Sequence, residues 1–150
     1  MNQLPNLLPP HLAALAVLAM IALHALLPIA AVVTIPFSLV GLVPLAAGGA
    51  VVVWTRGAFK RARTPIRPLT MSTALVTYGL YRYSRNPMYV GAVLILPGVA
   101  ILLGTVTHML VVPAFAFVLQ SNFIRPEERL LITTFGERYR AYRANVRRWV

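Results

Sequence analysis

The sequence has 150 residues and a net charge of +11, and 59% of its residues are hydrophobic while only 11% are charged. Soluble domains carry roughly 25% charged residues, so this composition indicates a membrane protein with a single domain, residues 1–150. Cysteine is absent, which excludes disulfides, thiolate metal sites and cysteine nucleophiles.

Two apolar segments in the first part of the chain are predicted to cross the membrane. The first covers residues 11–33 and the second covers residues 37–54. The second segment contains Gly41 and Gly48, and small residues of this kind let helices approach closely in lipid. We therefore expect a pair of membrane helices before the first basic segment.

Residues 55–87 are predicted to form a basic, proline-containing connection on the cytoplasmic side. Its segment 64–68, Thr-Pro-Ile-Arg-Pro, disfavours helix. Tyrosines then gather around the start of the next apolar segment, at positions 78, 81, 83 and 89. Aromatic residues of this kind are typical of a membrane edge.

The long uncharged stretch that follows suits two short crossings. Residues 86–124 contain no charged side chain, and this length exceeds the roughly 20 residues of one crossing. The predicted spans are 88–103 and 106–123. Such a hairpin returns the polar clusters on either side of it to the same face of the membrane.

The tail is predicted to form one amphipathic helix, residues 125–149, that lies at the membrane surface as a lid. Apolar and aromatic residues recur in it at steps of three and four, which is the spacing of one helix face. These residues are Leu131, Phe135, Tyr139, Tyr142, Val146 and Trp149. Gly136 is expected to bend or break this helix.

The fold class predicted from these segments is an all-α integral membrane protein with about four transmembrane helices and a C-terminal amphipathic helix. The fourteen basic residues fall in two blocks, 56–85 and 125–148, each beside an apolar segment. By the positive-inside rule, this multi-pass arrangement places both termini and the polar clusters in the cytoplasm. We expect anionic lipid headgroups as partners and no nucleic acid, although the net charge alone would suggest it.

Each polar residue near the membrane edge also has a purely structural explanation. Glu127 and Glu128 suit the start of a helix after Pro126, where the helix dipole favours them. Asn86 suits the cap of the third span, and Arg85 can extend to headgroups. Metal binding is not expected, because the three histidines lack metal-ligand spacing.

Two motifs in this chain resemble those of isoprenylcysteine carboxyl methyltransferases and their phospholipid N-methyltransferase relatives. The first is residues 75–91, LVTYGLYRYSRNPMYVG, which resembles the family signature around an Arg-His/Asn-Pro triplet. The second is residues 127–142, EERLLITTFGERYRAY, which is similar to the family's paired glutamates followed by Phe-Gly and two tyrosines. Asn86 stands where the eukaryotic enzymes have histidine, and Val146-Arg147-Arg148 lacks the proline of the family's motif near the end.

The resemblance implies an S-adenosyl-L-methionine-dependent methyltransferase embedded in the membrane, with a lipophilic acceptor. That acceptor is a prenylcysteine-like carboxylate, a lipid amine or a small thiol. The cofactor contacts implied are Leu75, Val76, Tyr81, Arg85, Asn86, Pro87, Met88 and Glu127, with Arg85 and Asn86 giving alignment. Lid or acceptor contacts implied more weakly are Arg125, Tyr139, Tyr142 and Arg148. The alternative hypothesis is a non-enzymatic membrane protein that binds anionic lipid through its basic face.

Overall fold

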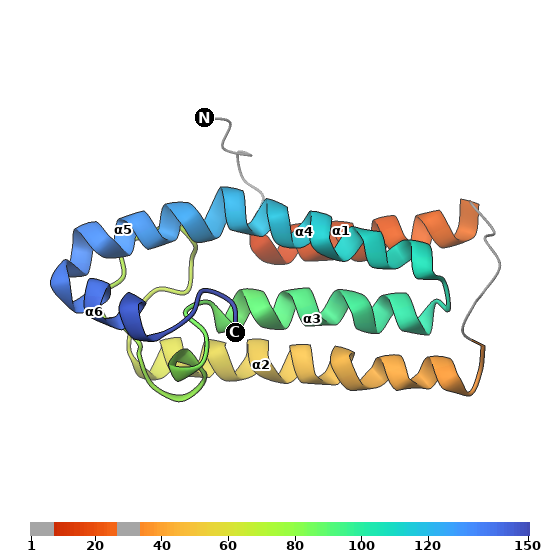
Figure 1. Ribbon diagram of the computed structural model, residues 1–150, viewed down its shortest axis with the longest axis horizontal. Helices are drawn as coiled ribbons and strands as arrows, with labels where there is room; N and C mark the ends of the chain where they lie inside the picture. Colours follow the sequence, from red (N-terminus) through yellow and green to blue (C-terminus); the bar gives the residue numbers. More distant parts are fainter. Residues whose placement is uncertain (1–7, 27–33) are drawn as a thin grey trace.

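The computed structural model describes residues 8–26 and 34–150, and all regular structure in these ranges is helical (Figure 1). The all-α class predicted from the sequence is thereby confirmed. The elements, in chain order, are α1 (Pro9–Leu26), η1 (Phe37–Gly41), α2 (Leu42–Arg61), η2 (Gly79–Arg82), α3 (Pro87–Leu102), η3 (Val106–Leu110), α4 (Val111–Leu119), η4 (Gln120–Ile124), α5 (Arg125–Phe135) and α6 (Glu137–Asn145).

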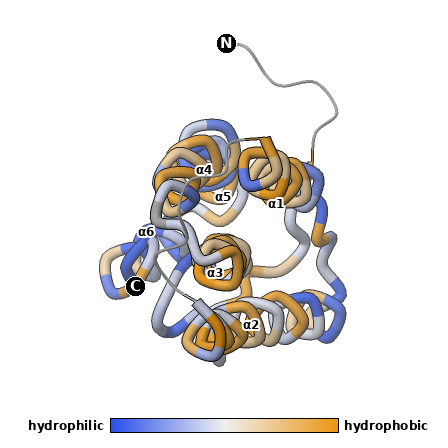
Figure 2. The backbone as a smooth tube through the Cα atoms, turned by 90° about the vertical axis from the view of Figure 1, so that its right-hand side faces the viewer, coloured by the Kyte–Doolittle hydropathy of each residue, from blue (hydrophilic) through white to orange (hydrophobic). Residues whose placement is uncertain are grey.

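Helix α3 is the centre of the bundle. It contacts α2 on one side and α1 and α4 on the other, as the end-on view shows (Figure 2). The largest apolar cluster joins α1, α3 and the α4–α5 region. Its buried members are Met20, Tyr89, Leu96, Ala100, Phe115, Leu119, Phe123 and Ile124.

Glycines set the distance between α2 and α3. A Cβ atom added to Gly48 would lie 2.5 Å from the Gly91 carbonyl oxygen, and one added to Gly98 would lie 2.8 Å from the Gly41 carbonyl oxygen. Gly41 and Gly48 are seven residues apart along the continuous segment of η1 and α2, and Gly91 and Gly98 are seven residues apart in α3. Each pair therefore shares one face. The two antiparallel backbones consequently touch at both points, as small residues permit in membrane helices.

Three helical segments are long and apolar enough to cross a membrane, namely Pro9–Leu26, Phe37–Arg61 and Thr107–Phe135. The second runs past the predicted end at residue 54 and continues to Arg61. Within it the hydroxyl of Thr55 donates to the Val51 carbonyl oxygen. Helix α3 is apolar but has only 16 residues. Four crossings therefore remain a prediction, and residues 27–33 of the predicted first span lie outside the described part of the chain.

The tail differs from the prediction at its start and agrees with it at Gly136. Helix α5 continues α4 through η4, a π-helical segment, so no break separates the last apolar span from residue 125. The break comes at Gly136, where φ is +51°, a conformation that side chains disfavour. The segment 125–149, predicted as one amphipathic helix, is thus divided into α5, α6 and a non-helical end.

Candidate functional site

A pocket lies at the end of the molecule that carries α5 and α6, at the left in Figure 1. The connection after α2, η2, the start of α3, α5 and α6 all contribute to its walls. The lining residues are Phe59, Pro65, Ile66, Arg67, Leu69, Thr70, Ser72, Ala74, Leu75, Val76, Tyr81, Arg85, Asn86, Met88, Tyr89, Glu127, Leu130, Leu131, Tyr139 and Tyr142. We call this the polar-end pocket.

One carboxylate enters this pocket from α5. Glu127 Oε1 accepts a hydrogen bond of 3.0 Å from the hydroxyl of Tyr89, which is almost fully buried in α3. The carboxylate has four acceptor positions, and this bond uses one of them. Glu127 is therefore held in place and retains the capacity to bind a positively charged group.

Arg85 brings a buried cation to the same pocket. Its side chain is only 8% exposed, and Nη1 lies 3.0 Å from Glu128 Oε1. Its Nε has no hydrogen-bond partner in the described part of the chain. A buried donor without a partner costs free energy, so this guanidinium is suited to an anion that enters the pocket.

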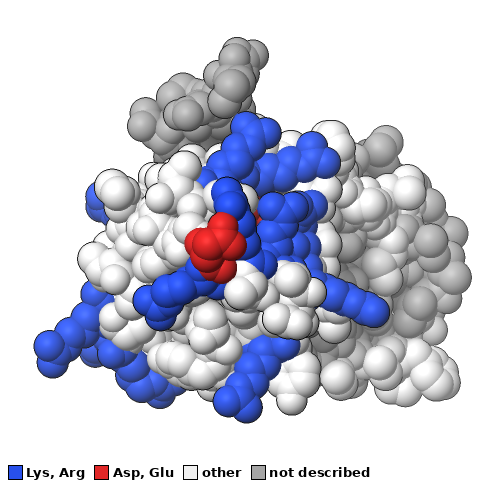
Figure 3. All heavy atoms as spheres, turned by 60° about the vertical axis from the view of Figure 1, so that its left-hand side comes forward, with Lys and Arg blue, Asp and Glu red and all other residues white. Residues whose placement is uncertain are grey.

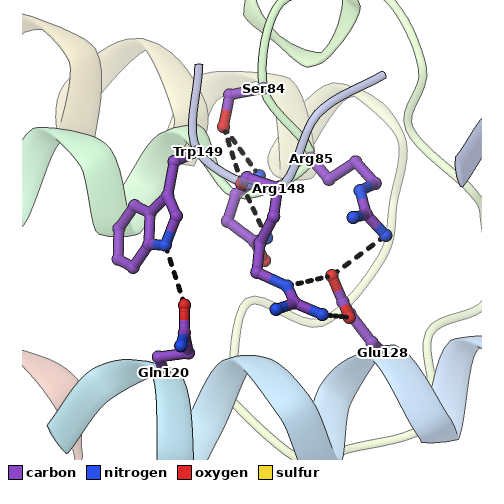
Figure 4. Close-up of polar contacts among 7 residues, drawn as sticks. Ser84, Arg85, Gln120, Glu128, Arg148 and Trp149 are labelled. Atoms are coloured by element: carbon purple, nitrogen blue, oxygen red, sulfur yellow. Dashed lines mark hydrogen bonds and ion pairs between the residues drawn. The ribbon is translucent and has the colours of Figure 1, made fainter. Parts of the chain in front are cut away.

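Glu128 does not line the pocket, and its carboxylate connects two arginines (Figure 4). Arg148 binds it through two bonds, from Nε to Oε1 at 3.0 Å and from Nη2 to Oε2 at 2.7 Å. The bond to Glu128 also raises the pKa of Arg148. Glu128 is buried, so water screens these ion pairs little. The carboxylate therefore fixes both Arg85 and Arg148.

The end of the chain, residues 146–149, is a strap that crosses the loop before α3. The backbone N–H of Arg85 donates to the Arg147 carbonyl oxygen at 2.9 Å. Ser84 Oγ and Asn86 Nδ2 donate to the Arg148 carbonyl oxygen at 3.2 and 3.1 Å. Asn86 occupies the N-cap position of α3, as predicted, but its side chain makes no capping bond to the helix and bonds to the strap instead.

Trp149 fastens the strap to the membrane helices. Its Nε1 donates to Gln120 Oε1 at 3.0 Å (Figure 4). Gln120 opens the π-helical segment between α4 and α5, and such wide turns occur often at functional sites. The strap is thereby held at both ends, by Arg85 and by Gln120.

Three tyrosines complete the aromatic wall of the pocket. Tyr142 donates a 2.6 Å hydrogen bond to the Tyr81 carbonyl oxygen, which joins α6 to η2. Burial raises the pKa of Tyr81, Tyr139 and Tyr142, and neighbouring tyrosines raise it further for Tyr81 and Tyr142. These phenols are thus neutral near pH 7 and act as hydrogen-bond donors and ring surfaces, not as bases.

The basic connection contributes a wall that the sequence analysis missed. Ile66, Leu69 and Thr70 line the pocket, and the loop is tied to itself by a 3.0 Å bond from the Thr73 N–H to Thr64 Oγ1. The signal available in the sequence was its apolar content, because Ile66 and Leu69 do not suit a connection that is wholly in water.

Most residues singled out from the sequence lie on the polar-end pocket. Those that line it are Leu75, Val76, Tyr81, Arg85, Asn86, Met88, Glu127, Tyr139 and Tyr142. Pro87 is buried at the start of α3, and Arg125 and Arg148 line a separate hollow on α5. Placement on the pocket leaves the individual roles of these residues as predictions.

Comparison with known proteins identifies the family to which this chain belongs. The model of the phospholipid methyltransferase family matches residues 37–138, which is more than half of the chain. Protein-S-isoprenylcysteine O-methyltransferase from Schizosaccharomyces pombe is 38% identical over 72 residues. The match covers 48% of this chain and 30% of that relative, so the chain spans less than a third of its length. No solved structure matches.

The chain belongs to the phospholipid methyltransferase family, and the resemblance stated from its two motifs is confirmed at that level. The family and the apolar helices together identify an integral membrane protein.

Proposed function

We propose that this member of the phospholipid methyltransferase family binds S-adenosyl-L-methionine in the polar-end pocket and transfers its methyl group to a lipophilic acceptor. The observation that carries the proposal is the pairing of Arg85 and Glu127 in one pocket. Arg85 presents a buried donor without a partner, and Glu127 presents a carboxylate with free acceptor positions. An amino acid, with its own carboxylate and ammonium, fits this pair.

The remaining walls fit the rest of the same molecule. A sulfonium cation or an adenine ring is attracted to aromatic faces, and Tyr81 and Tyr139 line the pocket. Leu75, Val76 and Met88 supply apolar surface beside them. The donor set therefore matches an amino acid at one end and a cationic, aromatic group at the other.

The contribution of the protein to the reaction is placement. When bound, S-adenosyl-L-methionine supplies an activated methyl group on a sulfonium. Arg85 and Glu127 would hold the two charged ends, which fixes the orientation of the reacting atoms. The connection with Ile66 and Leu69 would keep water out. No base is required for an acceptor that is already anionic.

The acceptor is expected to be a prenylcysteine-like carboxylate, a lipid amine or a small thiol. The positive-inside rule favours a cytoplasmic position for the pocket, because the basic residues flank it. A carboxylate acceptor gives a methyl ester that base cleaves, whereas an amine gives a product that base leaves intact. Mass spectrometry of lipids from cells with and without the protein, before and after base treatment, separates these classes.

Calorimetric titration of the detergent-solubilised protein with S-adenosylhomocysteine tests the cofactor. We expect saturable binding that Arg85→Gln and Glu127→Gln each weaken by about tenfold or more, since each removes a charged hydrogen-bond partner. The matched control is Glu137→Gln, which removes the same charge from an exposed ion pair with Arg140. Absence of binding in protein shown to be folded would refute the proposal.

A second candidate is a non-enzymatic protein that grips anionic lipid. Lysine and arginine side chains gather over the end of the molecule that carries α5 and α6 (Figure 3), and such faces attract anionic membranes. Glu127→Gln and Arg61→Gln distinguish the two candidates. If the folded protein binds anionic lipid but no S-adenosylhomocysteine, and Arg61→Gln weakens the lipid binding while Glu127→Gln does not, the second candidate is correct.

A further inference from the structure

A second hollow lies on α5, on a different face from the polar-end pocket. Its lining residues are Arg125, Glu128, Arg129, Ile132, Arg143 and Arg148. The pocket residues of α5 are Glu127, Leu130 and Leu131. The hollow has a volume of about 210 Å³, many times the roughly 15 Å³ that one water requires. It therefore has room for a small anionic group.

The arginines of this hollow greatly outnumber the available carboxylates. The chain contains three acidic side chains, and all three lie in the described part. Glu127 binds Tyr89, Glu137 pairs with Arg140, and both oxygens of Glu128 are taken by Arg85 and Arg148.

Arg125, Arg129 and Arg143 consequently have no carboxylate partner among the described residues. Like charges that converge on one hollow repel each other, and Glu128 offsets only part of this repulsion. A ligand with several anionic oxygens would relieve it. Guanidinium groups bind phosphate oxygens in paired hydrogen bonds, so phosphate is the group that fits best.

The place of the hollow in the chain gives it access to the membrane surface. Arg125 directly follows the uncharged stretch that ends at Ile124, which is fully buried. Ile132 adds apolar surface beside the arginines. This position corresponds to the depth of lipid headgroups, where arginines extend toward phosphates.

We propose that Arg125, Arg129, Arg143 and Arg148 form a binding site for a phosphate ester, either a phospholipid headgroup or a soluble phosphate. The site is distinct from the polar-end pocket and does not depend on methyl transfer. It also differs from a diffuse basic face, because only substitution of the arginines that line the hollow should weaken phosphate binding.

Titration in a nonionic, phosphate-free detergent tests the site. The probes are dihexanoyl phosphatidate and glycerol 3-phosphate, with binding followed by calorimetry. The test variant is Arg129→Gln/Arg143→Gln, and the control is Arg61→Gln/Arg138→Gln, which removes the same charge from arginines that do not line the hollow. We expect saturable binding that the test variant weakens by at least tenfold and the control by less than threefold.

The two probes identify the source of the phosphate. Binding of phosphatidate alone indicates a lipid headgroup, and equal binding of both indicates a soluble phosphate ester; either result supports the site. Absence of saturable binding of both probes, or equal weakening by both double variants, overturns it. Thermal unfolding confirms folded protein, so the test remains valid even if S-adenosylhomocysteine does not bind.

Discussion

The α2–α3 contact and the cluster around Glu128 hold the chain together by opposite means. The first has no polar side chain at its closest points and depends on the absence of Cβ atoms at Gly48 and Gly91. The second is a buried carboxylate between two arginines. The backbone contact fixes the distance between two helices, whereas the charged cluster fixes the position of one side chain, Arg85, at the polar-end pocket. The first type of contact specifies the bundle, and the second specifies the site.

The largest expected effect comes from removing the carboxylate. Glu128→Ala leaves the buried Arg85 without a counter-charge, and breaking a buried pair in this way typically costs about 3–5 kcal/mol. Thermal unfolding in detergent should show the loss. Glu127→Ala is the neighbouring control, because it removes a carboxylate that is hydrogen-bonded to Tyr89 and is not paired with an arginine of residues 8–26 or 34–150. Equal stability of the Glu128→Ala variant and the parent would show that the charged cluster does not support the fold.

The second largest loss of stability is expected from a side chain introduced at the glycine contact between α2 and α3. Gly48→Leu places a side chain against the Gly91 carbonyl oxygen, and overpacking costs about 1–3 kcal/mol. Gly49→Leu is a matched control one residue away, since a Cβ there meets no atom within 4 Å. The difference in unfolding temperature between the two variants measures the contact. Similar temperatures would mean that α2 and α3 are not held at this distance.

A smaller effect is expected at the end of the strap. Trp149→Phe keeps an aromatic ring but removes the bond to Gln120, which is worth about 1 kcal/mol. Hydrogen exchange should become faster at Arg85, whose N–H donates to Arg147. If hydrogen exchange at Arg85 is unchanged in Trp149→Phe, the bond to Gln120 does not stabilise the contact between the strap and Arg85.

The exposed ion pair between Glu137 and Arg140 should contribute least. Both side chains are largely in solvent, and such pairs contribute little to stability. Glu137→Gln should leave the unfolding temperature unchanged within error. A clear fall would show that α6 depends on charge as strongly as the Glu128 cluster does.

The elements that the sequence predicted well are those whose cause is local. Apolar length identified the helical segments, and Gly136 was recognised as a bend. The two motifs predict that Arg85 and Glu127 belong to one site, and both residues lie on the polar-end pocket. Local composition and short motifs were sufficient for these features.

The features that the sequence did not reveal depend on contacts between distant residues. Nothing near Glu128 indicates that it binds both Arg85 and Arg148. Nothing near Asn86 indicates that its amide bonds to the strap while the residue occupies the N-cap position of α3. The continuous helix through Ile124 required the π-helical segment, which has no reliable sequence pattern.

The strap also determines when, during synthesis on the ribosome, the contacts of Arg85 and Glu128 can form. The ribosome produces Arg85 well before Glu128, and Arg147 and Arg148 later still. A nascent chain interrupted before Arg147 would hold its membrane helices but would lack the acceptor for the Arg85 N–H and the second cation on Glu128. Arg85 and Glu128 thus gain these partners only after Arg148 has been made, and a chain interrupted earlier would occupy the bilayer with Arg85 held less firmly.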